Sequence, residues 1–313
     1  MEIRTRETHL VAKHAVVIDK FAHLEELVAH ASSRHVLFGT AEFKKLLFDV
    51  LDRNFAAGAI VLSLDIFDTL LLRDSSSELT RFIEIGKLMA SIIDGQHPEQ
   101  VNRHVGGIPT KRQLDAFLAR HLGTKASYRA GERVDGVGEG SLLEIHKVAS
   151  HLLAGNADYA DAFVETEIDF EATKVTVNTM LLDYVTLHRQ RGGRVVLATD
   201  MYMHATHVTA LLLRLGVSLE LFDLIISSAD TKHSKASGGI FPIIETRLGL
   251  PGSSFMHIGD SFNGDFKRPK QRGWEALHLP IADAEVKDRR ADHLASTAML
   301  QREFSLQVDI ASP

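Results

Sequence analysis

The sequence predicts an α/β protein built on a doubly wound parallel sheet, with a helical domain inserted after the first strand of that sheet. Two observations support this prediction. Short apolar runs of strand length alternate with helical segments in the second half of the chain, an order typical of parallel sheets. A long stretch separates the first apolar run, at 59–64, from the next, at 194–199, and its apolar residues recur at helical spacing.

The composition is that of an ordinary globular protein. The chain has 313 residues, of which 45% are hydrophobic and 24% charged, so it can bury a sizeable core. The formal net charge of -6, without a dense block of basic residues, argues against nucleic-acid binding. The absence of cysteine excludes disulfides, thiol catalysis and thiolate metal sites. No apolar run approaches the length of a membrane span, so we expect a cytoplasmic protein without membrane contact.

Residues 1–57 are expected to form a helical N-terminal extension. Apolar residues recur at helical spacing over 21–28 and again over 43–51. The segment 35–39 between them fits either a helix or a short strand. We interpret the extension as helices packed on the sheet domain. The alternative is a dimerisation element, which would make the protein a homodimer.

The sheet domain is expected to comprise residues 58–77 and 188–313. Its strands are predicted at five short apolar runs, at 59–64, 194–199, 224–228, 255–258 and 276–279. Because ligands bind beyond the carboxyl ends of the strands in such sheets, polar residues at these ends are candidates for chemistry. The first run ends at Asp65, the second ends with Thr199, and the fourth leads through Gly259 to Asp260.

Residues 78–187 are expected to form one helical domain looped out of the sheet domain. Helices are predicted over 79–93, 114–122, 142–153 and 160–187. The last of these carries four acidic residues, Glu165, Glu167, Asp169 and Glu171. We interpret this acidic run as a solvated helix face rather than as the lining of a substrate cleft.

The polar residues at the strand ends suit phosphate chemistry. Asp65, Asp260 and Asp265 supply the hard oxygen ligands that Mg²⁺ takes together with phosphate oxygens. Thr199 can donate a hydroxyl hydrogen bond to a phosphate oxygen, and Lys235 can supply a positive charge. Because a carboxylate nucleophile splits one displacement into two steps, Asp65 is the candidate nucleophile.

These motifs resemble those of the haloacid dehalogenase-like hydrolase superfamily. Its first motif, Asp-x-Asp-x-Thr after a strand, is similar to residues 65–69, which read Asp-Ile-Phe-Asp-Thr. The second Asp of this stretch, Asp68, stands three residues after the first instead of two. Its second motif is similar to Thr199 and its third to Lys235. Its fourth, Gly-Asp followed by another Asp, is similar to 259–265. The Phe-Asp-Thr-Leu variant also resembles a branch of predicted hydrolases associated with surface-polysaccharide synthesis.

The resemblance implies a Rossmann-like core with a helical cap, and a Mg²⁺-dependent phosphatase that acts on a small phosphorylated metabolite through an aspartyl-phosphate. It assigns Asp65 as nucleophile and metal ligand. The metal site would be completed by the backbone carbonyl of Phe67 and by Asp260 and Asp265. Thr199 and Lys235, named above, would hold the phosphoryl group.

One residue departs from the pattern of the family. Family phosphatases carry a general acid and base two residues after the nucleophile, where this chain has Phe67. Asp68, one residue later, is a candidate for the missing role, with a turn or cap as the alternative. Dehalogenases of the superfamily also lack the second acid and work without metal. The rivals are therefore a metal-independent 2-haloacid dehalogenase and a catalytically weak phosphate-binding or scaffolding protein.

Overall fold

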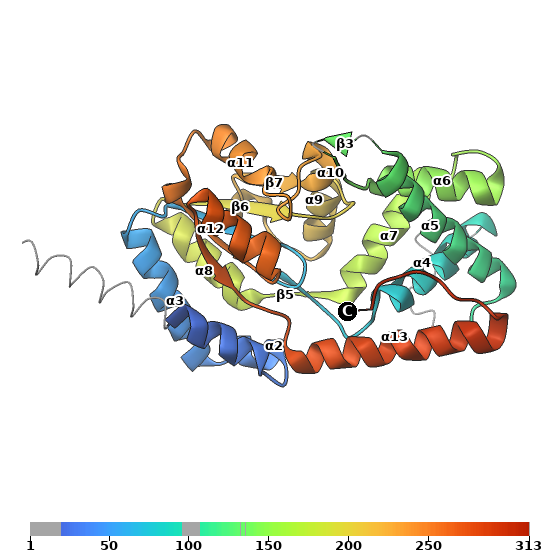
Figure 1. Cartoon of the computed structure of the whole chain (residues 1–313), viewed down its shortest axis with the longest axis horizontal. Coiled ribbons are helices and arrows are strands. Elements are labelled where there is room, and N and C mark those ends of the chain that lie inside the picture. Colours follow the sequence, from blue (N-terminus) through green and yellow to red (C-terminus); the bar gives the residue numbers. More distant parts are fainter. Residues whose placement is uncertain (1–19, 96–106, 132, 135, 313) are drawn as a thin grey trace, which may run out of the picture.

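The structure, a computed structural model, describes residues 20–95, 107–131, 133–134 and 136–312. It has two lobes, a parallel sheet flanked by helices and a bundle of long helices, and a long C-terminal helix runs along both (Figure 1). Parts of the expected extension and insertion, residues 1–19 and 96–106, lie outside the described residues. Across the described part of the chain, no helix combines the length and apolar character needed to cross a membrane.

The central sheet confirms the predicted α/β architecture. Its strands are β1 (Val61–Leu64), β6 (Arg194–Thr199), β7 (Leu224–Ser227), β8 (Phe255–Gly259) and β9 (Glu275–His278). They pair in parallel in the order β7-β6-β1-β8-β9. After β7 the chain crosses to the other side of β1, so the sheet is doubly wound. The five strands are those expected from the sequence, with ends shifted by one or two residues.

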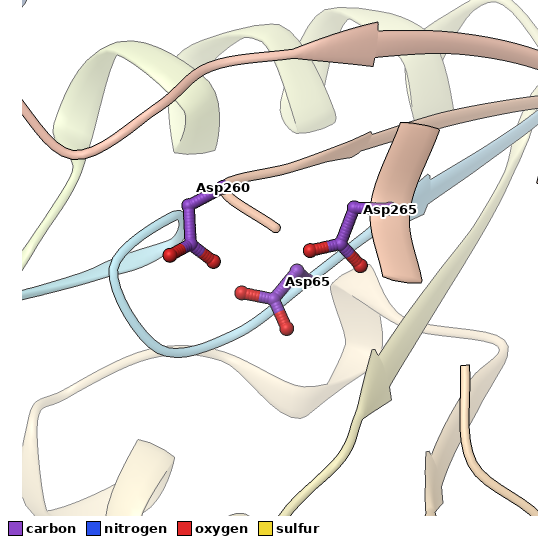
Figure 2. Close-up of side chains that lie close together, drawn as sticks. All are labelled: Asp65, Asp260 and Asp265. Atoms are coloured by element: carbon purple, nitrogen blue, oxygen red, sulfur yellow. The ribbon is translucent and has the colours of Figure 1, made fainter. Parts of the chain in front are cut away.

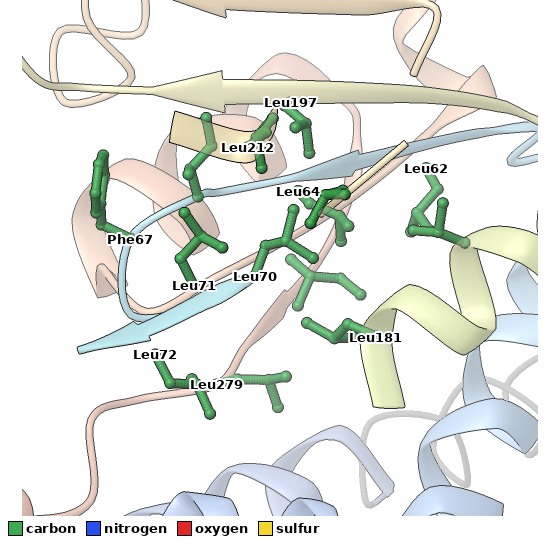
Figure 3. Packing of buried hydrophobic residues seen from close by; sticks show 14 of the residues in the cluster. Leu62, Leu64, Phe67, Leu70, Leu71, Leu72, Leu181, Leu197, Leu212 and Leu279 are labelled. Carbon is green, nitrogen blue, oxygen red and sulfur yellow. The ribbon is translucent and has the colours of Figure 1, made fainter. Parts of the chain in front are cut away.

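Side chains of the strands alternate between two apolar clusters, one on each face of the sheet. Leu62 and Leu64 of β1 enter the larger cluster, where Leu181 and Leu212 also lie, and Val61 enters the smaller one (Figure 3). This two-residue period is the reason why a continuous apolar run becomes a strand buried on both faces. The larger cluster also receives side chains from helices α3 (Ala41–Ala56), α8 (Thr179–Gln190) and α9 (Ala205–Arg214), and the smaller one from α11 (Ile240–Leu248).

The N-terminal helices pack on the sheet lobe. Residues 20–29 are helical, followed by α2 (Arg34–Phe38) and α3. The segment left open as helix or strand is therefore a helix. Leu24 and Leu47 are fully buried in the larger cluster. Dimerisation through this extension stays a prediction.

Among the described residues, the second lobe consists of four helices that pack closely. They are α4 (Glu78–Ile93), α5 (Lys111–Ala130), α6 (Leu142–Ala154) and α7 (Ala160–Lys174), with a small strand pair, β3 (Arg133–Val134) and β4 (Val137–Gly138), between α5 and α6. Two glycines allow the close approach. A Cβ atom on Gly86 would lie 2.5 Å from the amide nitrogen of Phe117, and one on Gly123 would lie 2.3 Å from the carbonyl oxygen of Ile145.

The single helix predicted over 160–187 is in fact two helices separated by a strand. Helix α7 ends at Lys174, strand β5 (Val175–Val177) follows, and α8 begins a new helix capped by the Asn178 side chain, which accepts a hydrogen bond from the amide of Leu181. Strand β5 pairs antiparallel with β2 (Leu71–Arg73), and this pair joins the two lobes. Helix α8 packs under the sheet, so it lies with the sheet lobe and not with the helical insertion.

The C-terminal part of the chain also differs from the expected domain division. Helix α13 (Asp283–Phe304) starts beside the sheet lobe and runs to the helical lobe, where Leu300 is buried in the cluster of α4 and α5 (Figure 1). Leu306 and Ile310 of the following tail pack on the same cluster. The segment expected within the sheet domain therefore holds both lobes.

The acidic run on α7 is only partly solvated, since Glu165 and Asp169 reach the surface, where both pair with Arg214, and the other two acids are buried. Glu167 is fully buried, where its carboxylate binds the guanidinium of Arg120 and lies 2.8 Å from Nε2 of His146. Glu171 is buried against Arg81. The prediction failed for these two acids because their partners come from other helices of the lobe.

The remaining elements are short. They are the 3-10 helices η2 (Leu219–Leu221) and η3 (Gly252–Ser254), the π-helix η4 (Phe262–Lys267), and the α-helices α10 (Ser228–Thr231) and α12 (Arg268–Arg272).

Candidate active site

Three carboxylates meet beyond the carboxyl ends of adjacent strands. Asp65 follows β1, Asp260 follows β8, and Asp265 comes from η4. One oxygen atom from each lies within 4.8 Å of the others, and the three side chains point toward one another (Figure 2). The structure therefore brings together the three acids that the sequence predicted as a metal site.

Lys235 lies in the same cluster. Its Nζ atom is 2.5 Å from Oδ1 of Asp65 and 2.6 Å from Oδ1 of Asp265, and the side chain is 3% exposed. The loop that carries Lys235 is fixed by Asp200, whose carboxylate accepts hydrogen bonds from the amides of Lys235 and Ala236 at 2.6 and 2.9 Å. Sequence reasoning missed Asp200, although its position directly after the strand-end Thr199 was a signal.

Asp265 is held by groups of the sheet. His257 of β8 places Nε2 2.9 Å from Asp265 Oδ1 and Nδ1 2.8 Å from the hydroxyl of Ser63, while the amide of Ser261 donates to the other Asp265 oxygen at 2.9 Å. His257 is fully buried between strands. A histidine inside an apolar strand was the available signal for this positioning role.

The cluster is electrostatically strained without a further cation. Burial raises the pKa of the Asp65 carboxyl above its usual range, with Lys235 opposing and Asp265 adding to the effect. Burial and the neighbouring carboxylates likewise raise the pKa of Asp260. For Asp265, burial is outweighed by Lys235 and His257, which hold its pKa well below the usual range. A single lysine therefore does not neutralise the three acids.

One oxygen atom of the cluster indicates where a cation would bind. Asp65 Oδ2 is buried and has no hydrogen-bond partner among the residues that the structure describes. A buried carboxylate oxygen without a partner is costly. The three carboxylates that meet here are all hard oxygen donors and fit a divalent cation such as Mg²⁺.

Thr199 and Phe67 complete the expected set. Both are buried and line the same cavity as Asp65. The Phe67 ring belongs to the larger apolar cluster and carries the guanidinium of Arg73 over its face, at 4.4 Å from the ring centroid. Phe67 thus occupies the position of the family's general acid with an apolar ring.

The environment of Asp68 contradicts a role as proton donor. Its carboxylate accepts hydrogen bonds from Arg34 at 2.8 Å and from Arg289 at 2.6 and 3.0 Å, and Arg73 Nη1 lies 3.6 Å away. Burial alone would raise its pKa, but the hydrogen bond from Arg289 and the charges of Arg73 and Arg34 hold that pKa well below the usual range. Asp68 stays ionised and joins the N-terminal and C-terminal segments to the first motif.

A cavity of about 530 Å³ opens over the cluster, and the sheet lobe, the helical lobe and the C-terminal segment contribute to its wall. Phe82 and Tyr128 come from the helical lobe, and Ala311 and Ser312 from the C-terminal tail. This volume suits a small ligand. The helical lobe and the C-terminal tail therefore form part of the wall above the reactive cluster.

Solved structures with some likeness to the chain include a hydrolase and a dehalogenase. A haloacid dehalogenase-like hydrolase from Xanthomonas campestris is 18% identical, with a TM-score of 0.38 over 71% of this chain and 83% of that chain. A 2-haloacid dehalogenase from Pseudomonas syringae is 16% identical, with a TM-score of 0.43 over 68% and 83%. At such low values the likeness says nothing about substrate. No curated protein matches the chain.

The family model of haloacid dehalogenase-like hydrolases matches residues 61–267. The match runs from β1, which positions Asp65, to η4, which carries Asp265. It therefore covers the reactive cluster and the helical lobe above it. On this match the chain belongs to the haloacid dehalogenase-like hydrolases.

Proposed function

We propose that the protein is a Mg²⁺-dependent phosphatase that acts on a small phosphorylated metabolite through an aspartyl-phosphate intermediate. The observation that supports this best is the cluster itself. Asp65, Asp260 and Asp265 converge with Lys235 at the floor of one cavity, and Asp65 presents a buried oxygen without a hydrogen-bond partner among the described residues. Carboxylates and a lysine at one point are the groups needed to bind Mg²⁺ and a phosphoryl group.

In this proposal Asp65, Asp260 and Asp265 hold the metal together with the backbone carbonyl of Phe67. When bound, Mg²⁺ supplies positive charge that screens the carboxylates from the phosphoryl oxygens. Lys235, which contacts Asp65 and Asp265 directly, neutralises the same negative charge and binds a phosphoryl oxygen. The Thr199 hydroxyl, at the end of β6, donates a hydrogen bond to another.

The reaction then takes two displacements at phosphorus. In the first, a carboxylate oxygen of Asp65 forms a bond to phosphorus while the bond to the leaving oxygen breaks, and the electron pair stays on that oxygen. In the second, water forms a bond to phosphorus and the bond to Asp65 breaks. Phosphate leaves, the carboxylate is restored, and the proton of the water passes to solvent.

The rival function is that of a 2-haloacid dehalogenase, and Phe67 is the observation that favours it, because the general acid is absent there in dehalogenases as well. The experiment that separates the two compares phosphate release from a panel of sugar, nucleotide, polyol and aryl phosphates with halide release from 2-haloacids. We expect phosphate release alone. Halide release that persists in EDTA would establish the dehalogenase function. If neither phosphate nor halide is released, the remaining candidate is a phosphate-binding or scaffolding protein.

Mg²⁺ is expected to stabilise the fold. A ligand that binds only the folded state at about 100 times its Kd raises the free energy of unfolding by about 2.7 kcal/mol. The measurement is the melting temperature in Mg²⁺ and in EDTA, which requires no turnover. Asp260→Asn supplies the matched variant. Without Mg²⁺ it should melt above wild type, because one repelling charge is removed, and with Mg²⁺ this advantage should vanish.

Two outcomes of these melting experiments would contradict the prediction. If Asp260 is only an acidic residue near the others, Asp260→Asn will change the melting temperature equally with and without Mg²⁺. A wild-type melting temperature that does not respond to Mg²⁺, even at high concentration, would contradict the metal assignment.

A further inference from the structure

Arg73 is a cationic residue of the cavity that the proposed mechanism has not used. It is the last residue of β2, where backbone pairing with Val175 of β5 fixes its position. Its side chain is 22% exposed and lines the same cavity as Asp65. The strand that joins the two lobes thus places a guanidinium beside the nucleophile's cavity.

The positive charge of Arg73 is only weakly compensated. Its Nε atom is buried without a hydrogen-bond partner in the described part of the chain, and its Nη2 atom donates to the weakly accepting sulfur of Met201, at 3.7 Å. Its nearest carboxylate, Asp68 at 3.6 Å, is already bound by Arg34 and Arg289 at hydrogen-bond distance. The Asp68 carboxylate is therefore shared among three guanidinium groups, of which Arg34 also binds Glu285 at 2.6 Å.

Another arginine of the cavity differs in this respect. Arg81 also lines the cavity, but its guanidinium binds the buried carboxylate of Glu171. Its charge is matched within the helical lobe. Arg73 is thus the better candidate for a cation that meets an anionic group of the substrate.

The place of Arg73 relative to Phe67 indicates which anionic group this is. The guanidinium carbon lies 4.4 Å from the centroid of the Phe67 ring, and a carboxyl group at position 67 would occupy the near part of that ring. Stacking on an aromatic face holds a guanidinium without using its N–H groups. The Arg73 guanidinium therefore lies against the ring that stands in place of the family's acid, and this contact leaves its N–H groups unused.

We propose that Arg73 is a catalytic residue that stabilises the charge of the leaving oxygen, in place of a general acid that would protonate it. The proposal rests on the phosphatase function and deepens it. As Asp65 bonds to phosphorus and the bond to the leaving oxygen breaks, the electron pair remains on that oxygen. Arg73 donates hydrogen bonds to the resulting oxyanion, which departs and takes its proton from solvent.

A cation and an acid have different signatures in the kinetics. The contribution of Arg73 grows with the charge that the leaving oxygen must bear, so it is largest for poor leaving groups. Loss of one charge-stabilising donor commonly costs about 10² to 10³ in rate. We expect Arg73→Gln to lose about this factor on an alkyl phosphate and far less on p-nitrophenyl phosphate, whose anion is stable by itself.

The experiment measures kcat/KM for aryl phosphates of graded leaving-group pKa and for one sugar phosphate, with wild type, Arg73→Gln and Arg73→Lys. Rates should fall more steeply with leaving-group pKa in Arg73→Gln than in wild type. Arg73→Lys, which keeps the charge, should lie between them. Circular dichroism reports whether each variant is folded, independently of turnover.

Two failures are distinguishable. An equal loss in Arg73→Gln on every substrate, with an unchanged dependence on leaving-group pKa, would overturn the role of Arg73 while the phosphatase function stands. A wild-type protein that releases phosphate from none of these substrates would overturn the phosphatase function, and the role of Arg73 with it.

Discussion

Asp65→Asn is expected to abolish turnover while leaving the fold intact. Asp65 is buried at the end of β1, and its carboxylate is the nucleophile of the proposed mechanism. Removal of a catalytic nucleophile can lower kcat by a factor of the order of 10⁶. The fold should survive because Lys235 keeps its partner Asp265 at 2.6 Å, and because one of three repelling carboxylates becomes neutral. Phosphate release and circular dichroism measure the two effects.

The same substitution at an exposed position provides the control. Asp183 of α8 is 58% exposed, lies outside the residues that line the cavity, and pairs with the exposed Lys44. Asp183→Asn should leave phosphate release at the wild-type rate. If Asp65→Asn keeps most of the wild-type activity with an unchanged spectrum, Asp65 is not the nucleophile.

Asp68→Asn is expected to cost stability rather than chemistry. The substitution leaves Arg34 and Arg289, both buried, without their shared carboxylate. Breaking a buried ion pair by removal of one partner typically costs about 3 to 5 kcal/mol of the free energy of unfolding. Asp68 has a φ of 62°, a conformation that asparagine also tolerates, so the variant tests the charge and not the backbone. Denaturant unfolding gives the difference.

The pH dependence of this loss has a definite sign. The pKa of Asp68 is lowered in the folded state. Its contribution to the free energy of unfolding is therefore fully present above the unfolded-state pKa of about 3.9, and it is lost as the pH falls from there through the folded-state pKa. The difference in the free energy of unfolding between wild type and Asp68→Asn should therefore become smaller at acidic pH. Asp183→Asn, which breaks an exposed pair, should cost less than about 1 kcal/mol at any pH. If Asp68→Asn lowers the free energy of unfolding by as little as the control does, Asp68 does not hold the N-terminal and C-terminal segments to the first motif.

The reactive cluster could be predicted from sequence because its signals are local. Asp65 and Asp260 each follow a short apolar run, and parallel strands bring their carboxyl ends to one edge whatever the rest of the chain does. The same reasoning placed Thr199 at the end of β6. The order of these elements was therefore enough to assemble the site.

The roles of the buried ion pairs could not be predicted in this way. Asp68 is adjacent to the first motif, but the arginines that bind it lie 34 and 221 residues away in the sequence. Glu167 belongs to an acidic run that reads as solvated, and only the packing of α5 against α7 supplies Arg120. Whether a carboxylate reacts, binds a cation or holds two segments together depends on such distant partners.

The hydrolysis of p-nitrophenyl phosphate with and without Mg²⁺ tests the central claim most directly. The wild-type protein, freed of metal with EDTA and dialysed, is assayed over a Mg²⁺ titration. We predict no phosphate release above background without the metal and saturable release as Mg²⁺ is added, because Asp65, Asp260 and Asp265 repel one another and the phosphoryl group until a cation joins them. Release that is unaffected by EDTA, or no release at saturating Mg²⁺, would contradict the assignment of this cluster as a Mg²⁺-dependent phosphatase site.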